Sequence, residues 1–339
     1  MDPSQYALPR GSRILVTGAN GYISTHVADQ LLGLGYSVRG TLRTEKPWLN
    51  EYFLNKYGKG RFETVVISLQ NKDEVDRALD GVDGLIHLAT DLSFSSDPNA
   101  VIPWVAQAAK DILEIASRKS SIKRVVLASS STAAYMTWPE PNGRQIDTNS
   151  WNDAGVAAAW DESTPEQKKP MTVYAASKTE AERQAWKWVE EKNPGFVLNS
   201  VLPCFNVGKV MFPEAQGSTM GFVRALLKGD ASSFNLPEQW YVDVEDVARL
   251  FVVGLLDPNV KSERIFAFGE QTHWQDVVSI LRKLRPDNKV IPDVPADIPR
   301  DRTTVVPRER AVNLLKGFYD QAGFTPIKKS LAEGIEDLK

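Results

Sequence analysis

The sequence contains one cysteine, Cys204, and three histidines in 339 residues. A single cysteine excludes an intramolecular disulfide and a cysteine metal cluster. The histidines, His26, His87 and His273, are scattered along the chain and no HExxH motif occurs, whereas a typical zinc site needs several ligands at close spacing. We therefore expect no bound metal.

Long apolar segments are also missing. Stretches such as Leu250 to Leu256 fall far short of the roughly 20 residues that span a membrane. The N-terminal segment MDPSQYALPRG lacks the basic and apolar regions of a signal peptide. No Asn-X-Ser/Thr acceptor occurs, which together with the lone cysteine fits a reducing compartment. We expect a cytoplasmic protein without a membrane partner.

The chain has no excess of positive charge. Its formal net charge is −3, so it offers no general attraction to nucleic acid, and we expect no such partner. Hydrophobic residues make up 42% and charged residues 24%, as in globular proteins with a sizeable core. The length suits one large α/β domain, alone or with a smaller one.

Apolar, β-rich runs alternate with helical patterns through the first two thirds of the chain. The predicted strands are Arg13–Thr17, Tyr36–Leu42, Phe62–Ser68, Gly84–Ala89, Arg124–Ser129, Phe196–Leu202 and Arg264–Gly269. The predicted helices between them include Tyr22–Leu34, Asn99–Arg118 and Met171–Glu191. This alternation predicts βαβ units and a mostly parallel sheet, covered on both faces.

The pattern changes after about Pro203. Shorter helices are predicted at Gly217–Lys228, Val244–Leu256, Trp274–Arg285 and Arg308–Tyr319. We expect residues 1–202 to form the main domain and residues 203–339 mainly a smaller lobe, with about 241–270 returning to the sheet. Residues 136–170 are rich in Pro, Asn, Trp and Asp, and an excursion of that length is usually functional.

A glycine turn follows the first predicted strand. The segment TGANGYIS spans residues 17–24 and contains Gly18, Asn20, Gly21, Tyr22 and Ile23. Glycines let the backbone approach a pyrophosphate, and the following helix offers free N–H groups to it. An ordinary glycine turn is the alternative, but the position after the first strand favours a dinucleotide. Ser24 stands at the third glycine position and is small enough to be tolerated.

The residues near the end of the second strand indicate which dinucleotide binds. No acid stands at Gly40, Thr41 or Leu42 to hold a ribose 2′-hydroxyl, whereas Arg43 and Lys46 are basic. A guanidinium can bind the 2′-phosphate of NADP with two parallel hydrogen bonds. The sequence therefore predicts NADPH, with a solvated basic patch as the alternative.

Tyr174 and Lys178 stand four residues apart, on one face of a predicted helix. A tyrosine has a pKa of about 10, and a nearby ammonium is expected to lower the pKa by stabilising the phenolate. Tyr174 could then protonate the alkoxide formed when hydride reaches a carbonyl carbon. The same lysine can bind the nicotinamide ribose.

Position separates this pair from a second YxxxK match, Tyr52 to Lys56. Tyr52 lies between the second and third strands, where a solvated helix face is expected. Tyr174 follows a strand that ends in Ala128 and three serines, and ligands bind at the carboxyl ends of such strands. A serine there can stabilise an oxyanion. The segment Gly217–Gly221 is no nucleophile elbow, because its centre is a threonine and no strand precedes it.

Taken together, the segments TGANGYIS, LIHLAT (85–90), VVLASSS (125–131), VYAASK (173–178) and YVDVEDVA (241–248) resemble the extended short-chain dehydrogenase/reductase family. Within it the chain is most similar to fungal NADPH-dependent carbonyl and aldehyde reductases, and less to yeast methylglyoxal and plant dihydroflavonol reductases. The resemblance runs from about Gly11 to the C-terminus. It implies a Rossmann-type α/β fold, with a doubly wound parallel sheet and a smaller C-terminal substrate-binding lobe.

The resemblance also implies a catalytic triad of Ser130, Tyr174 and Lys178, with Ser131 and then Ser129 as alternatives for the serine. Asp246 is expected to anchor a helix rather than react. Ser68 and Leu69 stand where an adenine-contacting aspartate often ends the third strand. The cofactor-binding positions are Gly18, Asn20, Gly21, Tyr22, Ile23, Arg43, Lys46, Ser68, Leu69, Leu88, Ala89, Thr90, Lys178 and Pro203.

Substrate contacts are implied by similarity to fungal carbonyl reductases. They are Phe94, Ser131, Met171, Leu236 and Gln239. Such a mostly apolar pocket favours hydrophobic or aryl ketones and aldehydes. Two other functions stay open: an NAD-retaining sugar-nucleotide epimerase or dehydratase, and a non-catalytic NADP-sensing protein. The resemblance alone favours a monomer or a weak homodimer.

Overall fold

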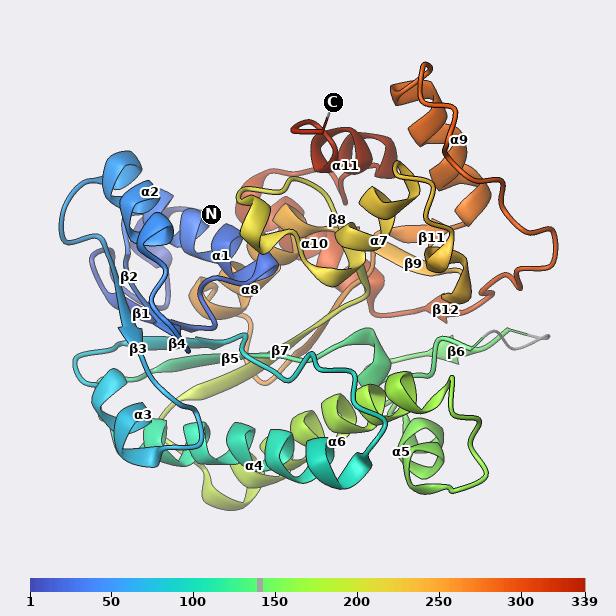
Figure 1. The fold of residues 1–339 in the computed structure, drawn as a ribbon. Coiled ribbons are helices and arrows are strands. Elements are labelled where there is room, and N and C mark those ends of the chain that lie inside the picture. The colour runs from blue at the N-terminus through green and yellow to red at the C-terminus, as the bar shows by residue number, and fades with distance from the viewer. Residues whose placement is uncertain (139–142, 339) are drawn as a thin grey trace.

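A parallel sheet forms the centre of the computed structural model, which describes residues 1–138 and 143–338 (Figure 1). In this part of the chain seven strands are ordered β10-β7-β5-β4-β1-β2-β3, and each pairs in parallel with its neighbours. They are β1 (Arg13–Thr17), β2 (Ser37–Leu42), β3 (Phe62–Val66), β4 (Gly84–His87), β5 (Arg124–Ala128), β7 (Val197–Pro203) and β10 (Arg264–Ala267). The predicted doubly wound sheet is confirmed.

Helices cover both faces of this sheet, as the βαβ alternation predicts (Figure 1). One face carries α1 (Tyr22–Gly33), α2 (Pro47–Tyr57), α8 (Val244–Leu256) and α10 (Arg308–Tyr319). The other face carries α3 (Lys72–Ala78), α4 (Pro98–Ser117) and α6 (Lys169–Lys192). Every helix and strand that the sequence predicts begins and ends within two residues of its predicted limits.

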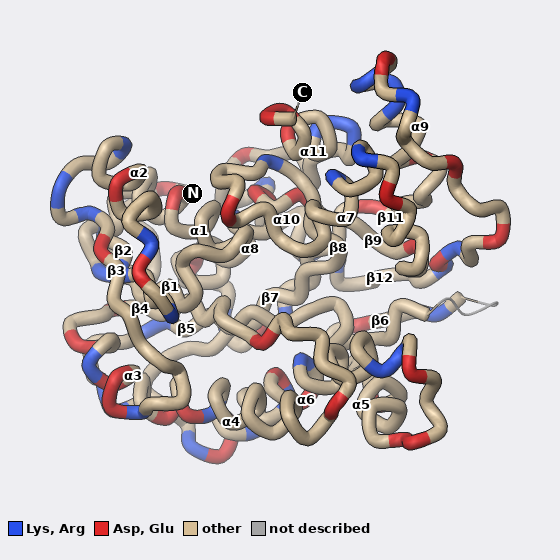
Figure 2. Tube along the Cα trace, in the orientation of Figure 1, with Lys and Arg blue, Asp and Glu red and all other residues tan. Residues whose placement is uncertain are grey.

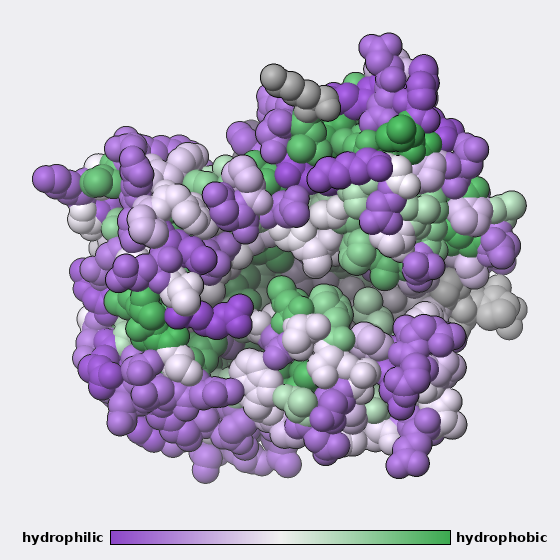
Figure 3. All heavy atoms as spheres, in the orientation of Figure 1, coloured by the Kyte–Doolittle hydropathy of each residue, from purple (hydrophilic) through white to green (hydrophobic). Residues whose placement is uncertain are grey.

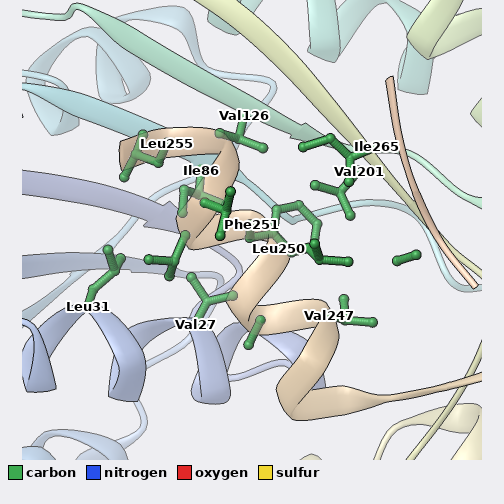
Figure 4. Packing of buried hydrophobic residues seen from close by; sticks show 14 of the residues in the cluster. Val27, Leu31, Ile86, Val126, Val201, Val247, Leu250, Phe251, Leu255 and Ile265 are labelled. Carbon is green, nitrogen blue, oxygen red and sulfur yellow. The ribbon is translucent and has the colours of Figure 1, made fainter. Parts of the chain in front are cut away.

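Helix α8 lies in the centre of the larger core, which explains its nearly continuous apolar sequence. Phe251 and Leu255 of α8 are fully buried against Ile86 and Val126 of the sheet, and Val27 of α1 packs beside them (Figure 4). Within the predicted range 241–270, residues 244–267 return to the main sheet through α8 and β10, whereas the two ends of the range belong to strands of a separate three-stranded sheet.

A smaller lobe stands over the carboxyl ends of the strands (Figure 1). It contains the three-stranded sheet of β8 (Phe205–Val207), β9 (Gln239–Asp243) and β11 (Glu270–Thr272), with helices α7 (Ser218–Leu226), α9 (Trp274–Leu284) and α11 (Ile327–Gly334). These elements share a separate apolar cluster. Short 3-10 helices are η1 (Pro3–Gln5), η2 (Ser131–Ala133), η3 (Pro213–Ala215) and η4 (Ser232–Asn235). The division at residues 202 and 203 stays a prediction.

The excursion at 136–170 has structure that its composition did not indicate; its residues 139–142 lie outside the described part. It forms β6 (Gln145–Ile146) and α5 (Asp153–Trp160). Strand β6 pairs with β12 (Thr304–Val305), which lies more than 150 residues later. The pairing joins the excursion to the C-terminal part of the chain.

Basic and acidic residues are interspersed along the backbone trace of Figure 2, without a large region of one sign. Among the helices of residues 1–138 and 143–338, none combines the length and apolar character needed to cross a membrane.

Arg124, at the start of β5, holds the C-terminal end of α8. Its side chain is buried and donates hydrogen bonds of 2.6–3.0 Å to the carbonyl oxygens of Gly254, Leu255, Asp257 and Val260. Carbonyls at a helix C-terminus have no partner within the helix. The guanidinium therefore serves as a buried cap that joins α8 to the sheet.

We predict that Arg124→Met lowers the free energy of unfolding by about 2–4 kcal/mol, because several buried carbonyls lose their donor. Arg118→Met is the matched control, since Arg118 pairs with Glu114 at the surface, and it should change stability by no more than about 0.5 kcal/mol. Urea unfolding of the three proteins measures both effects. Equal losses in the two variants would contradict the assigned role of Arg124.

Candidate active site

The glycine turn between β1 and α1 forms a concave backbone surface. Gly18 has a φ of 64°, and a Cβ on it would lie 3.2 Å from the Cβ of Ala89. A Cβ on Gly21 would lie 3.2 Å from the Gly18 oxygen. Gly21 is the N-cap of α1, and no side chain caps the helix. The first N–H groups of the helix are thus left for an anion such as a pyrophosphate.

Ser24, at the third glycine position of the turn, and Tyr22 are both buried. Ser24 is 4% exposed, so the serine fits where a third glycine is usual. The Tyr22 hydroxyl donates to the Gly208 oxygen at 2.8 Å, and its ring packs against Gly217. The side chain of Tyr22 therefore joins the turn to the smaller lobe, and a cofactor contact by this residue would use its backbone.

A hydrogen-bond network joins the ends of β1 and β4, where the strand order reverses. The Thr17 hydroxyl accepts from the amides of Leu88 and Ala89 at 2.9 and 3.0 Å. It lies 2.9 Å from Nδ1 of His87, and its remaining proton can go only to that nitrogen. His87 is then neutral and protonated on Nε2. Burial, assisted by the charge of Lys178, lowers the pKa of His87 to about 3.

Two features around the turn fit NADPH. Thr90, after β4, has a buried hydroxyl with no hydrogen-bond partner in the described residues. Arg43, after β2, is exposed and makes no ion pair or hydrogen bond with the described part of the chain. Lys46 is the partly exposed N-cap residue of α2. An anion at the end of β2 would therefore meet a free guanidinium.

The predicted adenine contacts lie at the edge of the sheet. Ser68 and Leu69 follow β3, and Ser68 lines an open surface depression with residues of the next turn. The Ser68 amide donates to Glu74 at 2.7 Å, so this amide is not available to a ligand. The roles of both residues stay predictions.

The phenol of Tyr174 and the hydroxyl of Ser130 meet at the carboxyl end of β5. Ser130 accepts from the amide and hydroxyl of Thr132 at 3.2 and 2.9 Å, which leaves its own proton for Tyr174. The Ser130 hydroxyl lies near enough to Tyr174 to favour the phenolate, which acts to lower the pKa of Tyr174. The structure thus pairs Ser130, rather than its neighbours, with the phenol.

The neighbouring serines face elsewhere. The Ser129 hydroxyl donates to Glu182 at 2.7 Å, away from Tyr174. Ser131 is 3% exposed and begins the 3-10 helix η2. This arrangement favours Ser130 over both alternatives for the catalytic serine.

The predicted direction of the Tyr174 pKa is wrong in this structure. Burial raises the pKa of Tyr174, and the nearby Ser130 hydroxyl offsets only part of this rise. The Lys178 ammonium donates instead to the Ala128 oxygen at 2.6 Å. Burial lowers the pKa of Lys178 to about 8, against the opposing charge of Glu182. Tyr174 is thus a fully protonated acid at neutral pH, beside a buried ammonium.

The predicted substrate contacts fall into two groups. Phe94 has a φ of 50°, is 37% exposed, and its ring centre lies 5.3 Å from that of Tyr174. Met171 lies one turn before Tyr174 on α6 and is partly exposed. Leu236 packs against the smaller lobe's apolar cluster, and Gln239 lines a small cavity in that lobe.

The surface is hollowed between the sheet side and the smaller lobe, and apolar residues stand in and beside this hollow (Figure 3). Pro203 ends β7 and is buried. The carboxyl ends of parallel strands are where this class of sheet binds ligands. A substrate that reached Tyr174 through the hollow would meet mostly apolar side chains.

Comparisons with known proteins agree with this geometry. The sequence profile of the NAD dependent epimerase/dehydratase family matches residues 14–269. The chain belongs to this family. A ketoreductase of Aspergillus novofumigatus is 43% identical over 99% of both chains. Aldehyde reductase 2 of Sporidiobolus salmonicolor is 36% identical, over 98% of this chain and 96% of its own.

Among solved structures, a yeast methylglyoxal/isovaleraldehyde reductase in complex with NADPH matches with a TM-score of 0.80. It is 25% identical, and the match covers 96% of this chain and 98% of the reductase. The family, the fold and the order of the motifs along the chain are therefore consistent with one another.

In this member of the epimerase/dehydratase family, several site residues escaped the sequence analysis. Glu182 lies four residues after Lys178, so helical spacing alone places it on the same face. Thr17 and His87 are register partners on β1 and β4, a pairing that only the strand order reveals.

Asp246 accepts from the Thr325 amide at 2.6 Å, as expected of an anchor.

We predict that Thr17→Val lowers the free energy of unfolding by about 2–4 kcal/mol, because two amides and His87 lose their shared partner. Thr17→Ser keeps the hydroxyl and should lose much less. Urea unfolding measures the difference, and equal midpoints for the valine and serine variants would show that the hydroxyl does not join the strands.

Proposed function

We propose that this protein reduces ketones and aldehydes to alcohols with NADPH. The observation that carries the proposal is the protonated phenol of Tyr174, which lies beside the Ser130 hydroxyl at the carboxyl end of β5. The names of the relatives support it, since one is a ketoreductase and another an aldehyde reductase. The yeast reductase with a similar fold was solved with NADPH.

Each residue has a distinct part in the reaction. NADPH supplies the hydride that reduces the carbonyl carbon. Tyr174 gives its proton to the carbonyl oxygen, and Ser130 donates a hydrogen bond to the developing oxyanion. Lys178 places a positive charge beside the phenolate that remains. This charge favours proton release at the moment when the oxygen becomes basic.

The cofactor is held at the reversal of the strand order. The turn of Gly18 and Gly21 receives the pyrophosphate, and Arg43 receives the 2′-phosphate that distinguishes NADPH from NADH. Thr90 offers a hydroxyl that has no partner in the described residues. Lys178 lies within the same cleft and can bind the nicotinamide ribose.

The substrate is a small carbonyl compound with a hydrophobic or aryl group. Two uncharged residues near Tyr174 support this. The Phe94 ring packs against the Tyr174 ring, and Met171 lies one helical turn before Tyr174 on α6. An apolar wall with few polar groups selects apolar ligands. A sugar nucleotide would need basic groups for its pyrophosphate at this position.

We predict that Tyr174→Phe lowers kcat by about 10²–10⁴-fold, because the proton donor is lost, while NADPH affinity stays nearly unchanged. Tyr52→Phe, in the second YxxxK match, is the matched control and should leave kcat unchanged. NADPH consumption with aryl ketones measures turnover, and fluorescence titration measures affinity. Undiminished turnover of the Tyr174 variant would remove this residue from the mechanism.

We predict that Arg43→Ala weakens NADPH binding about 10-fold to 100-fold, the loss of a charge-assisted hydrogen bond. NADH lacks the 2′-phosphate, so its affinity should hardly change. Lys59→Ala, an exposed lysine after α2, serves as the control. Fluorescence titrations with both nucleotides decide the matter: equal losses for NADPH and NADH would contradict the phosphate assignment.

A further inference from the structure

Glu182 is a fully buried carboxylate directly below the proposed active site. It accepts from the hydroxyls of Ser129 and Ser200 at 2.7 and 2.6 Å. Arg264 binds both carboxylate oxygens, at 2.9 and 3.0 Å, and the Trp186 ring nitrogen donates at 3.3 Å. These groups come from α6, β5, β7 and β10, so one carboxylate joins four elements.

The carboxylate is ionised despite its burial. The charge of Arg264 and the three hydroxyl and guanidinium donors lower the pKa of Glu182. Arg264 is fixed in turn, because it donates to the carbonyls of Thr148 and Ser150 at 2.8 Å and stacks 3.9 Å from the ring of Trp151. A buried charge of this kind is stable only with a complete set of partners.

Two contacts connect this cluster to the reacting groups. Ser129, held by Glu182, stands between Ala128, whose oxygen accepts from Lys178, and Ser130, which lies beside Tyr174. Glu182 also lies one helical turn after Lys178 on α6. Ala128, which accepts from the Lys178 ammonium, and Ser130, which lies beside the Tyr174 phenol, are thus both neighbours of the serine that Glu182 holds.

We propose that Glu182 is a positioning residue for carbonyl reduction, which holds the end of β5 through Ser129 and keeps the buried ammonium of Lys178 charged. The inference rests on the proposed function. The titratable and charged groups around Lys178 are Tyr174 on the same helix, His87 on β4, and Glu182 with Arg264 behind it. His87 is neutral, so the negative charge that acts on Lys178 is that of Glu182.

The test compares the pH dependence of kcat/KM in wild type and in Glu182→Gln, with acetophenone and phenylglyoxal as substrates and NADPH as reductant. In wild type we expect kcat/KM to fall above a pH of about 8, where Lys178 loses its proton. In Glu182→Gln the fall should begin roughly one pH unit lower, since the stabilising charge is gone. At pH 8 the variant should then be about fivefold less active, and at pH 9 or above nearly tenfold less active.

The variant leaves Arg264 buried without its partner and can lose stability for that reason. The double variant Glu182→Gln, Arg264→Gln removes both charges, so that no unpaired buried charge remains. The inference predicts that the double variant retains the shifted pH profile. A wild-type profile in the double variant, or in a folded Glu182→Gln, would overturn the inference, because Glu182 would then only stabilise the fold.

Glu180→Gln is the matched control. Glu180 lies on the same helix but pairs with Arg183 at its surface, so its profile should match wild type. NADPH affinity, measured by fluorescence across the same pH range, is a second readout that needs no substrate. If NADPH affinity falls above a pH of about 8 in wild type and about one pH unit lower in Glu182→Gln, but wild type reduces neither ketone nor aldehyde, the proposed function fails while the effect of Glu182 on the charge of Lys178 stands.

Discussion

Burial favours the neutral form of a lysine, yet the proposed chemistry needs the ammonium of Lys178 to be charged beside a phenol. Much of the site follows from this constraint. The Ala128 oxygen accepts from the ammonium at 2.6 Å, and the carboxylate of Glu182 opposes the effect of burial. That carboxylate needs partners of its own, which Arg264 and two serines supply. The charge of Lys178 is thus balanced through a chain of contacts that reaches β10, the edge strand of the sheet.

The parallel sheet makes this arrangement possible, because it brings the carboxyl ends of distant strands to one edge. The glycine turn follows β1, Thr90 follows β4, and Ser130 follows β5, with α6 laid across them. The bond between Thr17 and His87 fixes the strand ends on either side of the cofactor turn. Arg124 of β5 binds the end of α8, and this helix packs its apolar residues against the sheet. The excursion after β5 is held at residues 145–150, by the β6–β12 pairing and by Arg264.

Local patterns in the sequence predicted what depends on neighbouring residues. The strands and helices of the main sheet, the turn at Gly18 and the common face of Tyr174 and Lys178 follow from periodicity and spacing. The pKa of Tyr174 was predicted in the wrong direction, because it depends on burial and on where the ammonium points. The β6–β12 pairing joins segments far apart in the chain, which no local pattern reveals. Phe94, expected from resemblance alone, does lie beside Tyr174, whereas Leu236 packs within the smaller lobe.

The most direct measurement is a titration of Lys178 itself, by NMR of protein carrying isotope-labelled lysine, with Lys178→Met to assign the signal. A pKa of about 8 is predicted, because burial opposes the charge while Glu182 supports it. An ordinary lysine value of about 10.4 would contradict the account, since the ammonium would then lie in water rather than beneath the phenol.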